Sequence, residues 1–240
     1  MDVPCGSVVW DGPAPEVSIG SDRYDVRHRA LVMGVLTSSA EVDVVLTGAR
    51  RLAQEGAEAL ELSPTCRGVP PDEPDRLIPL VEALVAEVRL PLAVHTASAS
   101  VLAAALAAGA AIGSDVGGDQ LVRVRSAGAS VLVREIALPD RGSPADALGA
   151  VRRRAEAAGI PPSRVLVDAG PGTLALLRAG LARLGWPVVL STATGEAATA
   201  TQALGIALGA RVLRTSDVRS ARRTADVMAA ILSAREERPA

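Results

Sequence analysis

The 240-residue chain contains no lysine, no asparagine and no phenylalanine, so all 25 of its Lys and Arg positions are arginine. No mechanism that needs a lysine amine or an asparagine amide from this chain can operate. Aromatic residues make up only 1% of the sequence, and Tyr24 is the single tyrosine. Because nucleic acid bases stack on aromatic side chains, and because the formal net charge is −2, the composition argues against a nucleic acid partner.

Cysteine is scarce, and long apolar runs are missing. Cys5 and Cys66 are the two cysteines and have no CxxC spacing, which is typical of isolated thiols in a reducing compartment. The N-terminal stretch lacks the basic and apolar regions of an export signal. The longest apolar run, residues 101–112, is too short to span a bilayer and is interrupted by glycine. These features predict a cytoplasmic protein that does not enter a membrane.

Short runs rich in Val, Leu and Ile alternate with longer helical patterns rich in Ala, Leu and Arg. Strands are expected at 31–36, 58–62, 91–95, 110–113, 129–133, 164–168, 187–190 and 211–214. Helices are expected near 41–55, 74–87, 97–108, 118–127, 144–158, 172–184, 196–208 and 219–235. Strands of four to six residues with continuous apolar character suit a parallel sheet that is buried on both faces.

The alternation predicts an α/β protein with a single (β/α)8 TIM barrel. Eight successive units of about 25 residues match that fold in number and length. An open doubly wound sheet is the alternative, although the chain has no glycine-rich GxGxxG turn. We expect residues 31–240 to form the barrel and residues 1–30 to form an N-terminal extension. Within it, SVVW (7–10) and EVSIG (16–20) could form a β-hairpin that caps the lower mouth.

Residues that follow barrel strands line the mouth where such proteins bind ligands. Here they form a polar ring: Thr37, Glu61, Ser63, His95, Thr96, Ser114, Asp115, Arg134, Glu135, Asp168, Ser191, Thr192, Arg214 and Ser216. In the stretch VLVDAGPG (165–172), Asp168 ends an apolar strand and precedes an immediate turn. A carboxylate there is costly unless it has a partner, which makes Asp168 the leading candidate for a ligand-binding residue.

Several stretches, in this order, resemble the dihydropteroate synthase family. They are LVMGVL (31–36), GAEALEL (56–62), DRLIPLVEAL (75–84), residues 92–118 with GSDVGG, VLVDAGPG (165–172), LGWPVVLSTAT (184–194) and GARVLRTSDV (209–218). The resemblance covers nearly the whole chain from about residue 31. It implies a pterin-binding barrel of folate biosynthesis that condenses a pterin diphosphate with 4-aminobenzoate. It further implies a homodimer and, as is usual in the family, magnesium.

The resemblance also implies roles for individual residues. Asp168 matches the Asp that accepts hydrogen bonds from the amino-pyrimidine edge of the pterin, and Asp115 matches a second Asp beside it. Arg214 matches the anion-binding arginine, whose planar fork suits a diphosphate. Thr96 matches the Thr of an Asp-Thr pair, and Arg67 is the candidate to replace a loop arginine. Glu61 completes the set of candidate substrate-binding residues.

The chain differs from the family at several positions of the site, including those that would neutralise the charge of the diphosphate. His95 replaces the Asp of the Asp-Thr pair and is our candidate catalytic residue. The other departures are Ser114 for an Asn, Thr37 for the Asn that meets magnesium, Ala193-Thr194-Gly195 for Ser-Arg-Lys, and Ser216 for a His. Loss of one charge-stabilising group typically costs about 2.7–4 kcal/mol of catalysis. We therefore expect weak synthase activity or none.

Simpler structural roles compete with several of these assignments. Asp168 could be only a turn former, Asp115 a helix cap, and Arg214 a partner in a structural ion pair. His95 could be an acid or base, or a structural histidine. Glu61 and Glu135 could pair with Arg134 instead of taking part in catalysis. Asp217 is expected to cap the final helix, and Arg152-Arg153-Arg154 to form a solvated helix face.

Three functions stay open on the sequence alone. The chain could be a divergent dihydropteroate synthase homologue that binds a pterin, acting alone or as a subunit that pairs with a true synthase. It could be a pterin- or folate-dependent transferase with altered chemistry. It could also be a structural barrel that has lost ligand binding and serves as a partner protein.

Overall fold

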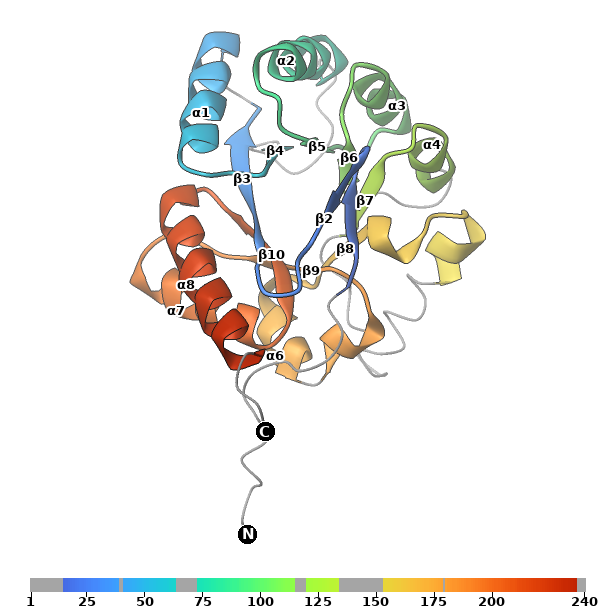
Figure 1. Ribbon diagram of the computed structural model, residues 1–240. Coiled ribbons are helices and arrows are strands. Elements are labelled where there is room, and N and C mark those ends of the chain that lie inside the picture. Colours follow the sequence, from blue (N-terminus) through green and yellow to red (C-terminus); the bar gives the residue numbers. More distant parts are fainter. Residues whose placement is uncertain are drawn as a thin grey trace.

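The computed structural model describes residues 15–38, 41–63, 73–114, 120–133, 153–178 and 180–236 (Figure 1). Eight parallel strands form a closed barrel in the order β10-β3-β4-β5-β6-β7-β8-β9. They are β3 (Leu31–Thr37), β4 (Ala59–Ser63), β5 (Leu92–His95), β6 (Ile112–Ser114), β7 (Ser130–Val133), β8 (Val165–Asp168), β9 (Val188–Ser191) and β10 (Ala210–Thr215). The predicted (β/α)8 TIM barrel is confirmed, because each expected apolar run is a barrel strand.

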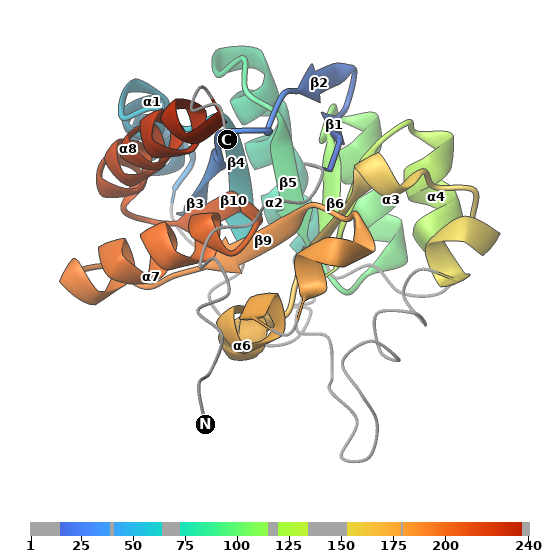
Figure 2. The same cartoon turned by 60° about the horizontal axis from the view of Figure 1, so that its bottom comes forward.

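Helices surround the barrel and connect its strands (Figures 1 and 2). They are α1 (Val42–Gln54), α2 (Glu73–Glu87), α3 (Ala99–Ala107), α4 (Gln120–Ser126), α6 (Thr173–Arg178), α7 (Glu196–Ala207) and α8 (Val218–Glu236), with short 3-10 turns η1 (Pro162–Arg164), η2 (Gly170–Gly172) and η3 (Leu181–Leu184). Of the helix expected at 144–158, residues 153–157 are helical and the segment before 153 lies outside the described residues.

The single helix expected over 172–184 is wrong. This segment is divided into α6 and η3, and Gly180 lies between them with φ 98°. A left-handed residue cannot continue a right-handed helix, and glycine adopts that conformation without steric cost. The glycines therefore mark where helices end. In the same way, α1 ends shortly before Gly56 (φ 99°) and α3 ends shortly before Gly109 (φ 107°).

Alternation along each strand separates two apolar clusters. Outward side chains pack under the surrounding helices, as Val94 and Leu213 do. Inward side chains fill the lower half of the barrel, and each strand contributes to them: Leu31, Met33, Ala59, Ala93, Ile112, Leu132, Leu166, Val189 and Val212. Because the chain has few aromatic residues, closely packed aliphatic side chains fill the interior of the barrel instead.

A close approach of helix to sheet occurs where α7 crosses β9. Gly205 lies on the inner face of α7, and a Cβ added there would overlap the end of the Leu190 side chain. Glycine at this position lets the helix lie nearer to the sheet than any other residue would allow. α7 also packs along α8, as Figure 2 shows.

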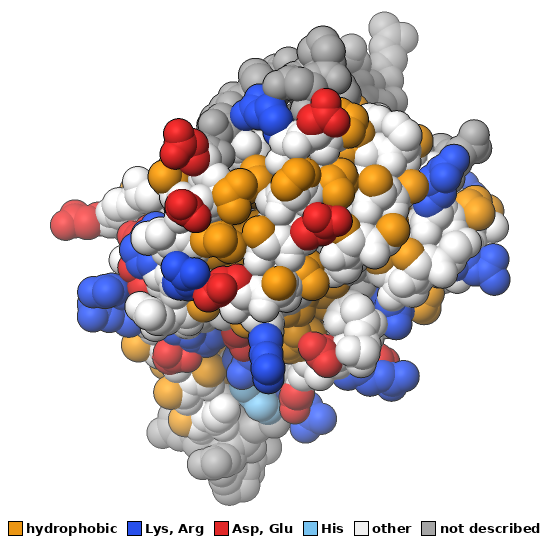
Figure 3. All heavy atoms as spheres, turned by 90° about the horizontal axis from the view of Figure 1, so that it is seen from above, with side chains coloured by type: hydrophobic (Ala, Val, Ile, Leu, Met, Phe, Trp, Pro, Cys, Tyr) orange, Lys and Arg blue, Asp and Glu red, His pale blue; other side chains and the backbone are white. Residues whose placement is uncertain are grey.

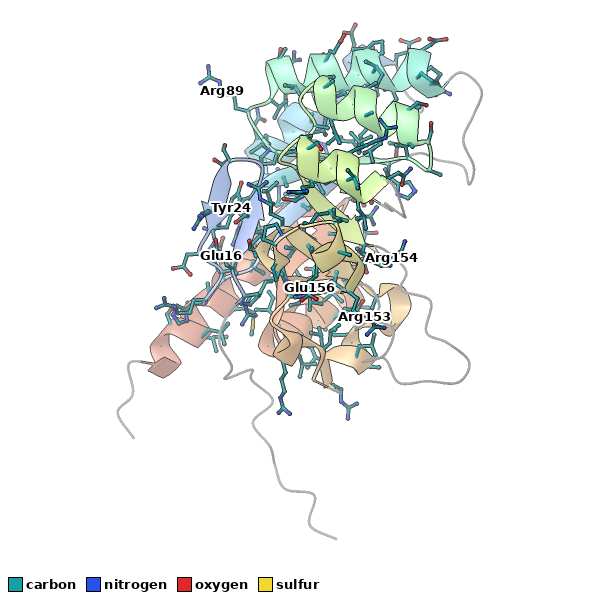
Figure 4. All side chains as sticks on the ribbon, turned by 90° about the vertical axis from the view of Figure 1, so that its right-hand side faces the viewer. Glu16, Tyr24, Arg89, Arg153, Arg154 and Glu156 are labelled. Atoms are coloured by element: carbon teal, nitrogen blue, oxygen red, sulfur yellow. The ribbon has the colours of Figure 1, made fainter. Side chains whose placement is uncertain are left out.

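A β-hairpin closes the lower end of the barrel. Its strands are β1 (Val17–Ile19) and β2 (Asp22–Tyr24), and both Val17 and Ile19 are buried against the inward apolar cluster. The Ser130 hydroxyl donates a 2.7 Å hydrogen bond to the carbonyl of Ser18. Figure 4 shows the hairpin, marked by Glu16 and Tyr24, at one side of the molecule.

A hairpin was expected at this end of the barrel, but one of its two strands differs from the prediction. Residues 16–20 supply the first strand, and the second is formed by 22–24, not by SVVW (7–10), which lies outside the described residues. A two-residue turn at Gly20 and Ser21, with φ 60° at Gly20, makes the local pairing possible. The adjacent segment therefore pairs in place of the more apolar one.

The outer surface offers a mixture of side-chain types. Arg153 and Arg154 extend from the outside of the molecule (Figure 4), as expected for a solvated helix face. The face seen in Figure 3 mixes apolar side chains with both acidic and basic ones. Val44 on α1 and Val85 on α2 are among the exposed large apolar residues. Within the described part of the chain, none of the helices has the length and hydrophobicity of a membrane span.

Candidate functional site

A polar layer lies directly above the apolar filling of the barrel. In a strand, residues two positions apart share one face. Two positions beyond the inward apolar residues lie Val35, Glu61, His95, Ser114, Asp168, Ser191 and Arg214. Position 134, which follows Leu132 in the same way, lies outside the described residues. The strands are parallel, so these side chains meet at the carboxyl-terminal mouth, the end opposite the hairpin.

Asp168 is held in place through both carboxylate oxygens. It is 2% exposed. Oδ1 accepts a 2.8 Å hydrogen bond from the backbone N–H of Gly170, and Oδ2 accepts one from the hydroxyl of Ser191 on the neighbouring strand. Asp168 therefore stabilises the turn after β8 and also lies at the end of a barrel strand, so these two features do not exclude each other. A carboxylate offers about four lone-pair positions, so two donors do not exhaust its capacity to accept.

Glu61 and Arg214 form an ion pair across the top of β3. Nε of Arg214 donates to Oε2 of Glu61, and Nη2 donates to Oε1 at 3.2 Å. The Glu61 side chain is fully buried, and that of Arg214 is 13% exposed. β3 lies between the two strands, and Val35 is the register partner of Glu61. The alternative of an ion pair for Arg214 is thus confirmed, with Glu61 as the partner.

His95 and Ser114 end adjacent strands and are register partners. Nδ1 of His95 lies 3.4 Å from the Ser114 hydroxyl. Thr96 is buried, and its hydroxyl accepts a 3.1 Å hydrogen bond from the backbone N–H of Ser98. Thr96 therefore shapes the turn into α3 in addition to any contact with a ligand.

Glu61, His95, Asp168 and Arg214 all lie at the middle or in the carboxyl-terminal halves of barrel strands, and of these four Glu61 and Arg214 are in contact. Asp115, Arg67, Arg134 and Glu135 lie outside the described residues. Asp217 caps α8 as expected, because its Oδ1 accepts a 3.2 Å hydrogen bond from the N–H of Ser220.

Two residues that support the mouth were not among the candidate substrate-binding or catalytic residues. Ser191 positions Asp168, and its place at the end of β9 is the signal that could have identified it. Gln202 on α7 is buried and donates a 2.8 Å hydrogen bond to the hydroxyl of Thr192, just after β9. No sequence pattern marks Gln202, because it lies in a helix of small residues.

The described residues of the mouth do not fit a magnesium ion. Magnesium prefers carboxylate oxygens and retained water in an octahedral arrangement. Both Glu61 oxygens accept from Arg214, which leaves Asp168 as the one other carboxylate among the described residues of the layer. Among the described residues, no three His, Cys, Asp or Glu side chains come together as a metal site. We therefore derive no step through a metal.

The chain is similar to known proteins in both sequence and structure. Residues 36–182, more than half of the chain, match the family model described as "Pterin binding enzyme". No curated protein sequence matches significantly.

Solved structures of dihydropteroate synthases share the fold. The Burkholderia cenocepacia enzyme complexed with 7,8-dihydropteroate is 25% identical, with a TM-score of 0.80 over 94% of this chain and 99% of that one. The Xanthomonas albilineans enzyme in complex with 7,8-dihydropteroate is 26% identical, with a TM-score of 0.76 over 94% of this chain and 100% of that one. The Vibrio fischeri enzyme is 20% identical with a TM-score of 0.77, over 95% and 100%, and shows the fold alone.

Proposed function

Because the chain belongs to the pterin binding enzyme family, we propose that the carboxyl-terminal mouth of its barrel binds a pterin. The observation that carries this proposal is the state of Asp168, a buried carboxylate whose oxygens are fixed by Ser191 and Gly170. A pterin presents adjacent N–H donors along its amino-pyrimidine edge. A fixed carboxylate, which only accepts hydrogen bonds, complements those donors without further rearrangement.

The remaining binding residues follow from the sequence resemblance. Asp115 directly follows Ser114, the last residue of β6, and is proposed as a second acceptor for the pterin. Thr96 and Arg67 are proposed to contact the ligand from the loops after β5 and β4. Support for this set comes from the polar layer, which supplies the buried floor on which such a ligand would rest.

We propose that condensation of a pterin diphosphate with 4-aminobenzoate is weak or lost. The chain has no lysine to neutralise the charge of the leaving group and no asparagine to hydrogen-bond in the site. Arg214, the described cation of the polar layer, donates two hydrogen bonds to Glu61. Each missing charge-stabilising donor lowers kcat by a factor of about 100 to 1000, so several losses together leave little turnover.

His95 supports a second candidate function, a pterin- or folate-dependent transferase with altered chemistry. It lies in the polar layer beside Ser114. An imidazole titrates near neutral pH and can give or take a proton where the family has a carboxylate. A non-catalytic subunit that pairs with a true synthase is the alternative that needs no chemistry at this residue.

We propose that the protein forms a homodimer through α7 and α8. Leu204 on α7 is 40% exposed, and Val227 and Ile231 on α8 are 59% and 51% exposed. The two helices pack along each other, and residues four positions apart on α8 share a face. Covering such side chains in an interface removes apolar surface from water, which is favourable.

Isothermal titration with 6-hydroxymethyl-7,8-dihydropterin tests the binding proposal. We expect saturable heat and a rise in Tm, because a ligand that binds only the folded state stabilises it. The absence of both would overturn pterin binding and favour a structural barrel. A parallel synthase assay with the pterin diphosphate and 4-aminobenzoate tests the proposed loss of catalysis. Efficient turnover by the purified chain would contradict it.

A further inference from the structure

The ion pair between Glu61 and Arg214 sets the charge of the mouth. Nε and Nη2, two of the three nitrogens of the guanidinium, donate to the two oxygens of one carboxylate. This fork-to-fork geometry is the strongest arrangement that the two groups can form. Because Glu61 is fully buried, water does not compete for its oxygens. The pair is therefore fixed and carries no net charge.

The position of the pair limits what Arg214 can offer to a ligand. An anion placed against the remaining edge of the guanidinium would also lie near the Glu61 carboxylate, on the other side of the same planar group. In a poorly hydrated site, repulsion from the farther carboxylate offsets a substantial part of the attraction to the guanidinium. Arg214 is consequently a weak anion receptor as long as Glu61 is ionised.

The other described polar groups of the layer are the carboxylate of Asp168, the hydroxyls of Ser114 and Ser191, and the imidazole of His95. Asp168 contributes a second carboxylate, and Ser114 and Ser191 are neutral. Among the described residues of the layer, two carboxylates, Glu61 and Asp168, therefore lie with one guanidinium, that of Arg214. A mouth of this charge favours a neutral ligand and disfavours a diphosphate.

We propose that the mouth selects a pterin whose side chain carries no phosphate, and that Glu61 is the residue that determines this specificity. Glu61 acts through Arg214, which it holds as an internal counter-ion and so withdraws from ligand anions. The inference rests on the proposed pterin-binding function and refines it by naming the class of ligand. It also gives a physical reason for low synthase activity that is independent of the missing lysine.

The first test compares two ligands on the full-length wild-type chain. Isothermal titration at one ionic strength uses 6-hydroxymethylpterin and its diphosphate ester. We expect the neutral pterin to bind at least tenfold more tightly. Equal or tighter binding of the diphosphate ester would overturn the inference while leaving pterin binding intact. If neither ligand binds, the proposed function fails and the inference fails with it.

The second test removes the charge of Glu61 while keeping its shape. In Glu61→Gln, the ratio of the two affinities should shift toward the diphosphate ester by at least tenfold. The shifted binding should also weaken with added salt, because it depends on the attraction between the guanidinium charge and the diphosphate. Melting curves establish that the variant is folded. A folded Glu61→Gln with an unchanged ratio would show that Glu61 does not set the preference.

Glu58→Gln is the matched control for this change. Glu58 precedes β4 at the opposite end of the barrel, where it accepts from Arg222 at 2.8 Å and from Arg29. The control removes a carboxylate from an ion-pair network of the same strand but leaves the mouth untouched. We expect the ratio of affinities to stay as in the wild type, and a shift equal to that of Glu61→Gln would overturn the assignment.

Discussion

The hydroxyl of Ser191 donates a hydrogen bond to Oδ2 of Asp168 from the neighbouring strand, while the N–H of Gly170 donates to Oδ1 at 2.8 Å. One donor comes from β9 and the other from the turn after β8. The carboxylate is therefore oriented before any ligand arrives, and the predictions for the mouth begin here.

Asp168→Asn should weaken binding of 6-hydroxymethyl-7,8-dihydropterin about 10- to 100-fold. The amide has nearly the same shape but places a donor where the ligand also donates. A hydrogen bond to a charged group is worth about 1.5–3 kcal/mol, and 1.4 kcal/mol is tenfold in affinity. Titration calorimetry measures the change. Asp217→Asn is the control, since asparagine caps a helix as well as aspartate does; unchanged affinity in Asp168→Asn would refute the assignment.

Ser191→Ala should lower pterin affinity by about 3- to 10-fold, which corresponds to one lost hydrogen bond. The effect is indirect, because Asp168 keeps the Gly170 N–H but loses the donor that fixes its second oxygen. Ser191→Thr retains the hydroxyl and should recover most of the affinity. If Ser191→Ala and Ser191→Thr bind equally well, the hydroxyl has no positioning role.

Arg211→Met should raise the free energy of unfolding by about 1–2 kcal/mol at pH 7. Arg211 is 2% exposed, and its Nη1 donates only to the backbone carbonyls of Ile206 and Ala210. Its Nε has no hydrogen-bond partner, and burial lowers the pKa of Arg211 to about 10. The charged form is thus disfavoured in the folded state, and the substitution removes that cost.

The pH dependence of Arg211 has a defined sign. Its folded-state pKa, about 10, lies well below the ordinary value of an arginine side chain. Between these values the unfolded chain binds more protons, so the contribution of Arg211 to stability improves as pH rises. The advantage of Arg211→Met should therefore be complete below pH 10 and shrink above it. Chemical denaturation measures it, and the exposed Arg153→Met should change stability by less than about 0.5 kcal/mol. A destabilised Arg211→Met would mean that the two carbonyl contacts outweigh desolvation.

Gly205→Ala should destabilise the barrel although alanine favours helices by about 1 kcal/mol over glycine. The new methyl group would collide with Leu190, and overpacking of a core costs about 1–3 kcal/mol. Leu190→Ala removes the colliding atoms. In a double-mutant cycle, the two substitutions together should cost at least about 1 kcal/mol less than the sum of the single changes. Additive effects would contradict the close approach.

Ile231→Glu should convert the proposed homodimer into a monomer. A carboxylate at the centre of an apolar interface is buried without a partner. Size-exclusion chromatography with light scattering gives the mass, which we expect to fall from twice the chain mass to one. Val122→Glu on α4 is the control, because Val122 is 54% exposed and lies away from α7 and α8. A wild-type monomer would overturn the dimer.

The sequence predicts the barrel well because its strands are short apolar runs and its helices end at glycines such as Gly56. It also predicts which residues reach the mouth, since a residue two positions beyond an inward apolar side chain shares its direction. It could not predict that Arg214 pairs with Glu61, 153 residues away. Periodicity predicts which face of a strand a side chain lies on, but not which residue it contacts. Strand 22–24 was missed because it is polar and has no apolar pattern.

The hairpin beneath the barrel fixes an order of events as the chain is made. β1 and β2 leave the ribosome before every barrel strand, yet Ser18 meets its partner Ser130 only 112 residues later. The floor that receives Val17 and Ile19 includes Leu166 and Val212 and so does not exist until nearly the whole chain is available. The hairpin therefore cannot complete its contacts with the barrel floor before β10 has been synthesised.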